Sequence, residues 1–213
     1  MRYLTFLMVI MLGFTANAQQ LAVLHYGGGG DWYSNPTALP NLAQFCNQQL
    51  GTNIQTKPAE VQPSSLDLFD YPYVHMTGHG NVYFSDEDLT NLRNYLLSGG
   101  FLHIDDNYGM DSYLRKELDK LFPDKKLIEL GIDHPIFSSH FSFPKGLPKI
   151  HEHDGGRPQA LGMIHEGRLV LLYTFESDLG DGWENPEIHN DPPEVRLTAL
   201  RMGANIIKYA FEY

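Results

Sequence analysis

The chain is poor in cysteine and in clustered positive charge. Its 213 residues include one cysteine, Cys46, and they carry 15 basic against 26 acidic side chains, for a formal net charge of −11. Cys46 has no partner for a disulfide within the chain, and its place in an apolar helical pattern predicts a buried small side chain rather than a nucleophile. The acidic balance argues against binding to a nucleic-acid backbone, so we expect no nucleic-acid partner.

Long hydrophobic runs are also missing, apart from one at the N-terminus that is too short to span a bilayer comfortably. It follows Arg2 and ends in Ala16-Asn17-Ala18, the small-x-small pattern that signal peptidase recognises. We therefore predict a signal peptide over residues 1–18 and a single domain over residues 19–213, in a periplasmic or secreted protein. An uncleaved membrane anchor is the alternative. No cysteine lies at the predicted cleavage site, so after cleavage we expect neither a lipid anchor nor a membrane span.

Strand and helix patterns alternate along the rest of the chain, which is typical of a layered α/β domain with a largely parallel sheet. The turn at residues 165–168 predicts an antiparallel hairpin near the C-terminus. Residues 133–154 and 176–190 are expected to be long loops. Strands are predicted at residues 21–26, 53–56, 73–77, 101–104, 126–130, 160–164 and 169–174. Helices are predicted at residues 39–50, after an N-cap at Ser85, and at residues 110–122 and 192–209.

Polar side chains follow the predicted strands at the ends where open α/β sheets bind ligands. The glycine run after the first strand lacks the Gly-Lys-Ser/Thr of a phosphate loop and the spaced glycines of a dinucleotide fingerprint, so a tight turn is the favoured interpretation. Aromatic side chains nearby are candidates for the wall of a pocket. The predicted ligand site consists of Gly28, Gly29, Gly30, Asp31, Trp32, His79, Asp105, Asp106, Tyr108, Glu176, Asp178 and Trp183.

Two histidines stand two residues apart in the segment His151-Glu152-His153-Asp154, on the same side if the segment is extended. With a carboxylate from Asp105 or Asp106 they would suit zinc or another divalent ion, so His151, His153 and Asp154 are candidate metal ligands. Because no His-Glu-x-x-His helix or cysteine pair is present, the main expectation is no cofactor, with a divalent metal ion as the alternative. Asp105 and Asp106 could instead stabilise a helix N-terminus.

Several motifs together carry a family resemblance. They are Gly-Gly-Gly-Asp-Trp-Tyr at 28–33, Met-Thr-Gly-His-Gly at 76–80, Leu-Arg-Asn-Tyr-Leu-Leu-Ser-Gly-Gly-Phe-Leu at 92–102, Leu-Phe-Pro at 121–123, Asp-His-Pro-Ile-Phe at 133–137 and Gly-Trp-Glu at 182–184. With Asp105-Asp106 they resemble the bacterial family called domain of unknown function 4159. The resemblance implies a flavodoxin-like three-layer sandwich, similar to class I glutamine amidotransferases, in an envelope protein without an assigned activity.

The likeness to amidotransferases implies a nucleophilic cysteine on a sharp turn after a strand and a histidine after a late strand. Here residues 105–107 are Asp-Asp-Asn, residues 175–178 are Phe-Glu-Ser-Asp, and Cys46 belongs to another element. An activated nucleophile needs a base within hydrogen-bond reach, so thiol-dependent ammonia release is not expected.

Three functional hypotheses remain. The first is a non-catalytic module that binds a small envelope-derived ligand, such as a sugar or a peptide fragment. The second is a metal-assisted or acid/base hydrolase. Its candidate bases are Asp105 and Asp106, and its candidate acids or metal ligands are His79, His151 and His153. The third is a structural subunit of an envelope assembly.

Overall fold

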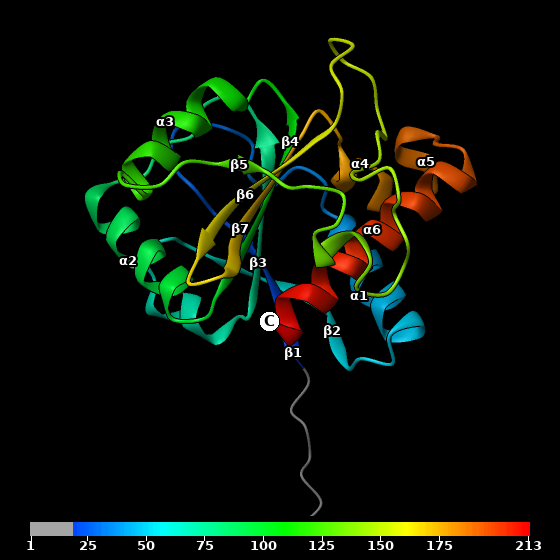
Figure 1. Ribbon diagram of the computed structural model, residues 1–213, viewed down its shortest axis with the longest axis horizontal. Coiled ribbons are helices and arrows are strands. Elements are labelled where there is room, and N and C mark those ends of the chain that lie inside the picture. Colours follow the sequence, from blue (N-terminus) through cyan, green and yellow to red (C-terminus); the bar gives the residue numbers. More distant parts are fainter. Residues whose placement is uncertain (1–18) are drawn as a thin grey trace, which may run out of the picture.

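The computed structural model describes residues 19–213 and shows an α/β fold with three layers (Figure 1). The predicted signal peptide lies outside the described residues. The strands are β1 (Gln19–Leu24), β2 (Ile54–Val61), β3 (Tyr73–His79), β4 (Phe101–Tyr108), β5 (Ile128–Glu129), β6 (Gln159–His165) and β7 (Arg168–Phe175).

One seven-stranded sheet forms the middle layer, with the strand order β2-β1-β3-β4-β7-β6-β5. The five strands from β2 to β7 in this order run parallel, β6 pairs antiparallel with β7, and β5 pairs antiparallel with β6. The prediction of a mostly parallel sheet with an antiparallel hairpin near the C-terminus is confirmed, and the architecture is consistent with a flavodoxin-like fold.

Helices cover both faces of the sheet (Figure 1). The α-helices are α1 (Ala38–Gln49), α2 (Asp86–Leu97), α3 (Asp111–Leu121), α4 (Leu179–Trp183), α5 (Pro186–His189) and α6 (Pro193–Glu212), and the short 3-10 helices are η1 (Leu66–Asp70) and η2 (Pro135–Phe137). Helices α1, α4 and α6 pack against one another, while α2 packs against α3 on the other side.

Two hydrophobic cores follow from the two-residue period of the strands. In β4, Phe101 belongs to the core beneath α1 and α6, whereas Leu102 and Ile104 belong to the core beneath α2 and α3. In β7, Leu172 and Tyr173 divide between the two cores in the same way. A strand that is buried on both faces has apolar residues at most positions. Such runs predict the central strands from the sequence alone.

The predicted cap at Ser85 is confirmed. Its hydroxyl accepts a hydrogen bond from the backbone N–H of Asp88, and the Asp88 carboxylate accepts from the backbone N–H of Ser85, which completes a capping box. Three acidic residues in the first turn of α2 add a favourable interaction with the helix dipole.

Several element boundaries differ from the predictions. β1 ends at Leu24 rather than at residue 26, and β2 continues to Val61 through Pro58. Proline is tolerated there because β2 is an edge strand, where a missing backbone N–H breaks no central ladder. The predicted loop at residues 176–190 contains the two short helices α4 and α5.

None of the helices within residues 19–213 is both long and apolar enough to cross a membrane.

Candidate functional site

The glycine run after β1 packs against the loop that follows β3. Tyr83 donates its backbone N–H to Gly27 at 2.9 Å, and Gly30 donates to the Asn81 carbonyl at 3.0 Å. A Cβ on Gly30 would lie 2.6 Å from that same carbonyl oxygen, and Gly28 has a φ of +106°, which favours glycine. The favoured interpretation of this run as a tight turn is therefore correct, and its glycines serve a close contact between two backbones.

Asp31 and His79 face each other at the surface between these two loops. The Asp31 carboxylate lies 2.9 Å from Nδ1 of His79 and also accepts the backbone N–H of His79. The His79 side chain is about half exposed, at 51%. This pair joins the glycine-rich loop to the loop that follows β3.

The predicted aromatic wall does not form as expected. Trp183 is fully buried and donates its indole N–H to the Ala199 carbonyl at 2.8 Å, so it is a core residue between α4 and α6 and cannot contact a ligand. Trp32 stacks on the His25 ring at 4.0 Å and lines a separate hollow of about 180 Å³. Of these three aromatic residues, Tyr108 alone lines the cleft at the ends of β4 and β7 that is described below.

Asp105 and Asp106 lie within β4, which continues beyond the predicted strand end, and they are directed to opposite faces of the sheet. Asp105 is fully buried and accepts hydrogen bonds from the backbone N–H groups of Leu179 and Gly180 at the start of α4. Burial raises the pKa of Asp105 to about 7. Asp106 accepts from the N–H groups at the start of α3, and burial raises its pKa too. Asp106 thus stabilises the N-terminus of the helix that follows it, the alternative that the sequence left open, whereas Asp105 stabilises the N-terminus of α4, which lies far along the chain.

A cleft of about 290 Å³ opens beyond the carboxyl ends of β4 and β7. Tyr108 forms part of its rim, where its hydroxyl lies 3.2 Å from Asp154 and its ring packs 4.8 Å from the His153 ring. Glu176 is paired with Lys149 at 2.7 Å. The lining consists of Asp106, Asn107, Tyr108, Gly109, Asp111, Ser112, His153, Asp154, Phe175, Glu176 and Asp178.

Asp178 is the most unusual side chain of this cleft. It is fully buried in a left-handed conformation with φ 59°, immediately before α4. One carboxylate oxygen pairs with Nε2 of His153, while the other, Oδ1, is buried without a hydrogen-bond partner. Burial, with further contributions from Asp105 and Asp181, raises the pKa of Asp178 to about 9. An unpaired acceptor in a cleft lining is a group that a donor on a ligand could satisfy.

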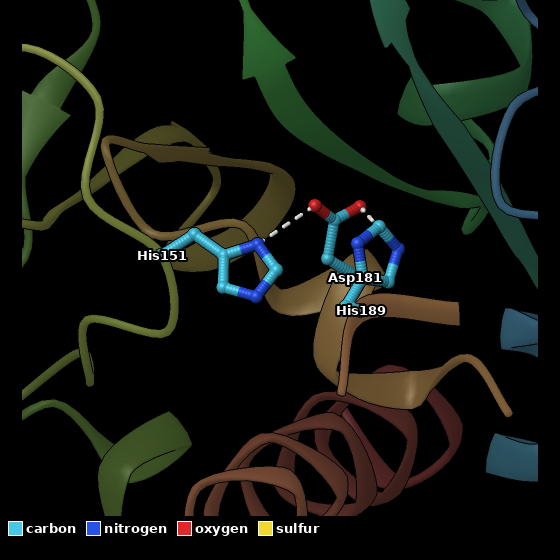
Figure 2. A group of neighbouring side chains, drawn as sticks. All are labelled: His151, Asp181 and His189. Carbon is cyan, nitrogen blue, oxygen red and sulfur yellow. Dashed lines mark hydrogen bonds and ion pairs between the residues drawn. The ribbon is translucent and has the colours of Figure 1, made fainter. Parts of the chain in front are cut away.

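A second cluster lies beside the cleft, where His151, Asp181 and His189 converge (Figure 2). Nδ1 of His151 lies 2.9 Å from Oδ2 of Asp181, and Nε2 of His189 lies 3.6 Å from Oδ1 of the same carboxylate. The second nitrogen of His151 pairs with Asp191 at 2.6 Å. These residues come from a loop, from α4, from the end of α5 and from the segment after it.

The electrostatics of this cluster reflect paired opposite charges. The hydrogen bond to Asp181 raises the pKa of His151 to about 9, against the opposing effect of burial, and Asp191 contributes in the same direction. Burial alone would raise the pKa of Asp181, but hydrogen bonds from His151 and Asn35 leave it below its ordinary value.

The predicted pair of histidines is divided between the two sites. His151 faces Asp181 and Asp191, whereas His153 faces Asp178 and Tyr108. Within residues 19–213, the group of side chains with the spacing of metal ligands includes His151 but neither His153 nor Asp154. The metal-ligand set expected from the sequence stays a prediction, and the structure groups His151 with Asp181 and His189 instead of His153 and Asp154.

A polar chain links the sheet to this cluster. The Thr77 hydroxyl donates to Asn107 at 2.7 Å, the Asn107 amide donates to Asn35, and the Asn35 amide donates to Asp181. Two of these side chains are amides, which can donate and accept at once. The chain therefore holds the Asp181 carboxylate in one orientation relative to β3 and β4.

The family model described as "Domain of unknown function (DUF4159)" matches residues 20–211, nearly all of the described chain. The chain belongs to this family. Among curated proteins, no match is found. The expected resemblance to the family is confirmed.

The DUF4159 domain thus brings together a buried acidic group in an open cleft and a two-histidine, one-carboxylate cluster, both at the carboxyl edge of its sheet. Cys46 takes part in neither site. It is fully buried in the core beneath α1, and burial raises the pKa of its thiol to about 12, which suppresses the reactive thiolate. The chemistry available at this edge is that of carboxylates and imidazoles.

Proposed function

We propose that this DUF4159 domain is an exported module that binds a small polar ligand in the cleft between the ends of β4 and β7. The observation that carries the proposal is Oδ1 of Asp178, a buried acceptor without a protein partner in the lining of a cleft. Leaving such a group unsatisfied costs about 1–3 kcal/mol, and a ligand donor would remove that cost.

The lining indicates the chemistry of the ligand. Five acidic side chains among the lining residues, with no lysine or arginine, favour ammonium and hydroxyl donors and disfavour phosphates and carboxylates. The Tyr108 and Phe175 rings offer apolar surface to the body of such a molecule. An amino sugar or the free amino end of a short peptide combines these features, which supports an envelope-derived ligand.

We also propose that the domain is related to class I glutamine amidotransferases. A flavodoxin-like sheet flanked by helices on both faces supports a class I glutamine amidotransferase-like ancestry, and ligand binding at the carboxyl edge accords with the rule for open α/β sheets. The Ala16-Asn17-Ala18 segment supports export to the periplasm or the medium.

The test is a titration of the purified protein with glucosamine and, separately, with glucose, followed by NMR chemical-shift changes. The two sugars differ at one position, where an ammonium replaces a hydroxyl. We expect glucosamine to bind more tightly and to shift signals around Tyr108 and Asp178. Asp178→Ala, which removes the Oδ1 acceptor, should weaken glucosamine binding at least 10-fold, while Asp133→Ala, at an exposed carboxylate outside the cleft, should not change it. Equal responses to both sugars, or binding unaffected by Asp178→Ala, would refute this ligand chemistry.

One observation favours an acid/base hydrolase as the second candidate. The His153–Asp178 pair stands in the cleft, and Asp178 has a raised pKa, as a general acid requires. The carboxylates of Asp105 and Asp106, the candidate bases of the hydrolase hypothesis, accept hydrogen bonds from helix N-termini. Hydrolysis of a chromogenic glucosaminide that Asp178→Asn abolishes would place the hydrolase ahead of the binding module.

A further inference from the structure

Beside the ligand cleft, two imidazole nitrogens and a carboxylate point toward one another (Figure 2). We propose that His151, Asp181 and His189 bind a divalent first-row transition metal ion of the zinc type. Two histidines and one carboxylate form a ligand set that zinc and its neighbours accept, whereas calcium and magnesium prefer sites built from oxygen alone.

The distances suit such an ion with little movement. The three ligand atoms lie within 4.8 Å of one another. Zinc–ligand bonds of about 2.0–2.1 Å in tetrahedral geometry require ligand atoms roughly 3.3 Å apart. Nδ1 of His151 lies 2.9 Å from Oδ2 of Asp181, and Nε2 of His189 lies 3.6 Å from Oδ1, so each imidazole stands near that spacing from one oxygen of the shared carboxylate.

The surrounding groups orient these side chains as they do in metal sites. A metal-bound histidine usually donates its second ring N–H to a carboxylate, and Nε2 of His151 lies 2.6 Å from Asp191 while Nδ1 faces Asp181. The Asn35 amide donates to Asp181 and fixes that carboxylate. Glu184 lies 3.0 Å from Nε2 of His189, the same nitrogen that faces Asp181, so a metal ion bound there would replace this hydrogen bond.

Ion pairing alone is the competing explanation. Ion pairs between these histidines and carboxylates would hold the loop at residue 151 against α4 and α5 without any metal. The two explanations predict different zinc affinities. A metal site binds zinc and loses it when any one of the three side chains is removed, whereas ion pairs alone give no zinc binding.

The experiment is a zinc titration of the purified full chain, without a histidine tag, against a chromogenic competing chelator. We expect the wild-type chain to bind one equivalent of zinc, and His189→Ala to bind at least 100-fold more weakly. His153→Ala is the matched control, because His153 lies two residues from His151 and also pairs with an aspartate, yet is not in the group. We expect its zinc affinity to be unchanged. Asp191→Asn should weaken zinc binding about 10- to 100-fold.

A wild-type chain that takes up no zinc would overturn the proposal, and so would equal losses in His189→Ala and His153→Ala. If His189→Ala fails to fold, His189→Gln carries the same test, because glutamine keeps a hydrogen bond to Glu184 within reach and is a poor zinc ligand. The metal proposal does not depend on the ligand cleft, so glucosamine binding and zinc binding can fail separately.

Discussion

Replacing Asp178 with asparagine tests whether the protein buries a carboxyl group that stays protonated at neutral pH. The pKa of Asp178 is raised to about 9 from an ordinary value of 3.8, mainly by burial. Between these two values the folded chain holds a proton that the unfolded chain has released. The contribution of this group to stability is therefore fully present below about pH 4 and is lost progressively as the pH rises toward 9.

The size of the effect follows from the same linkage. Each pH unit in that window corresponds to about 1.4 kcal/mol, so the interval from pH 5 to pH 8 corresponds to at most about 4 kcal/mol. Asparagine resembles the protonated carboxyl group and does not titrate. We expect the free energy of unfolding of Asp178→Asn to be close to that of the wild type at pH 5 and to exceed it by roughly 1–4 kcal/mol at pH 8.

The assay is urea unfolding at both pH values, followed by circular dichroism, for the wild type, Asp178→Asn and the control Asp154→Asn. Asp154 is exposed at the rim of the same cleft, so its replacement should leave the pH dependence unchanged. A difference between Asp178→Asn and the wild type that stays constant from pH 5 to pH 8 would refute the reasoning. It would mean that Asp178 is ionised in the folded chain, with His153 carrying the compensating charge.

Three other substitutions test the structural assignments. Gly30→Ala should lower the free energy of unfolding by about 1–3 kcal/mol in urea unfolding, because its Cβ would lie 2.6 Å from a backbone oxygen of the neighbouring loop; an effect below 0.5 kcal/mol would show that the two loops can separate. Trp183→Ala should cost about 3–5 kcal/mol, because the side chain is fully buried, whereas Tyr33→Ala, at a side chain 65% exposed, should cost little; similar losses would contradict the core assignment. Ser85→Ala should cost about 1 kcal/mol through loss of the capping box, and calorimetry should show a lower melting temperature; an unchanged melting temperature would show that the cap adds nothing.

The layered fold was predictable because its signals are local. β3, β4 and β7 are apolar runs buried on both faces, and α2 begins at a residue whose hydroxyl caps it. Such patterns need no knowledge of distant contacts. Edge positions were less predictable, since β2 contains a proline that argues against a strand unless its place at the sheet edge is known.

The candidate site was predictable only in part, for a reason that lies in α4 and α5. The sequence pointed to Asp178 because it follows a predicted strand, and to His151 because it stands two residues from another histidine. The sequence did not point to Asp181 or His189. They lie in α4 and α5, and helices of five and four residues are too short to give a clear periodic pattern. Asp181 and His189 lie near His151 only because tertiary contacts fix the positions of α4 and α5.

Trp183 shows the opposite error. An aromatic residue beside glycines in a polar segment suggested a pocket wall, but the indole ring packs into the core beneath α6, with its N–H satisfied by a backbone carbonyl. Residue type alone did not distinguish these outcomes, because aromatic side chains serve both core packing and ligand contact.

Helix α4 connects the two proposed sites, and this bears on how function can be tested. Asp178 precedes the helix, Asp181 lies within it, and Asp105 holds its first N–H groups from the adjacent strand. Removing the Asp105 carboxylate would leave those buried N–H groups without their acceptor and displace both neighbouring carboxylates. A loss of ligand or metal binding in Asp105→Ala would therefore not identify Asp105 as a binding or catalytic group. Substitutions at Asp178 and His189 act on one site each, so they are the ones that can distinguish a binding module from a hydrolase and a metal site from an ion pair.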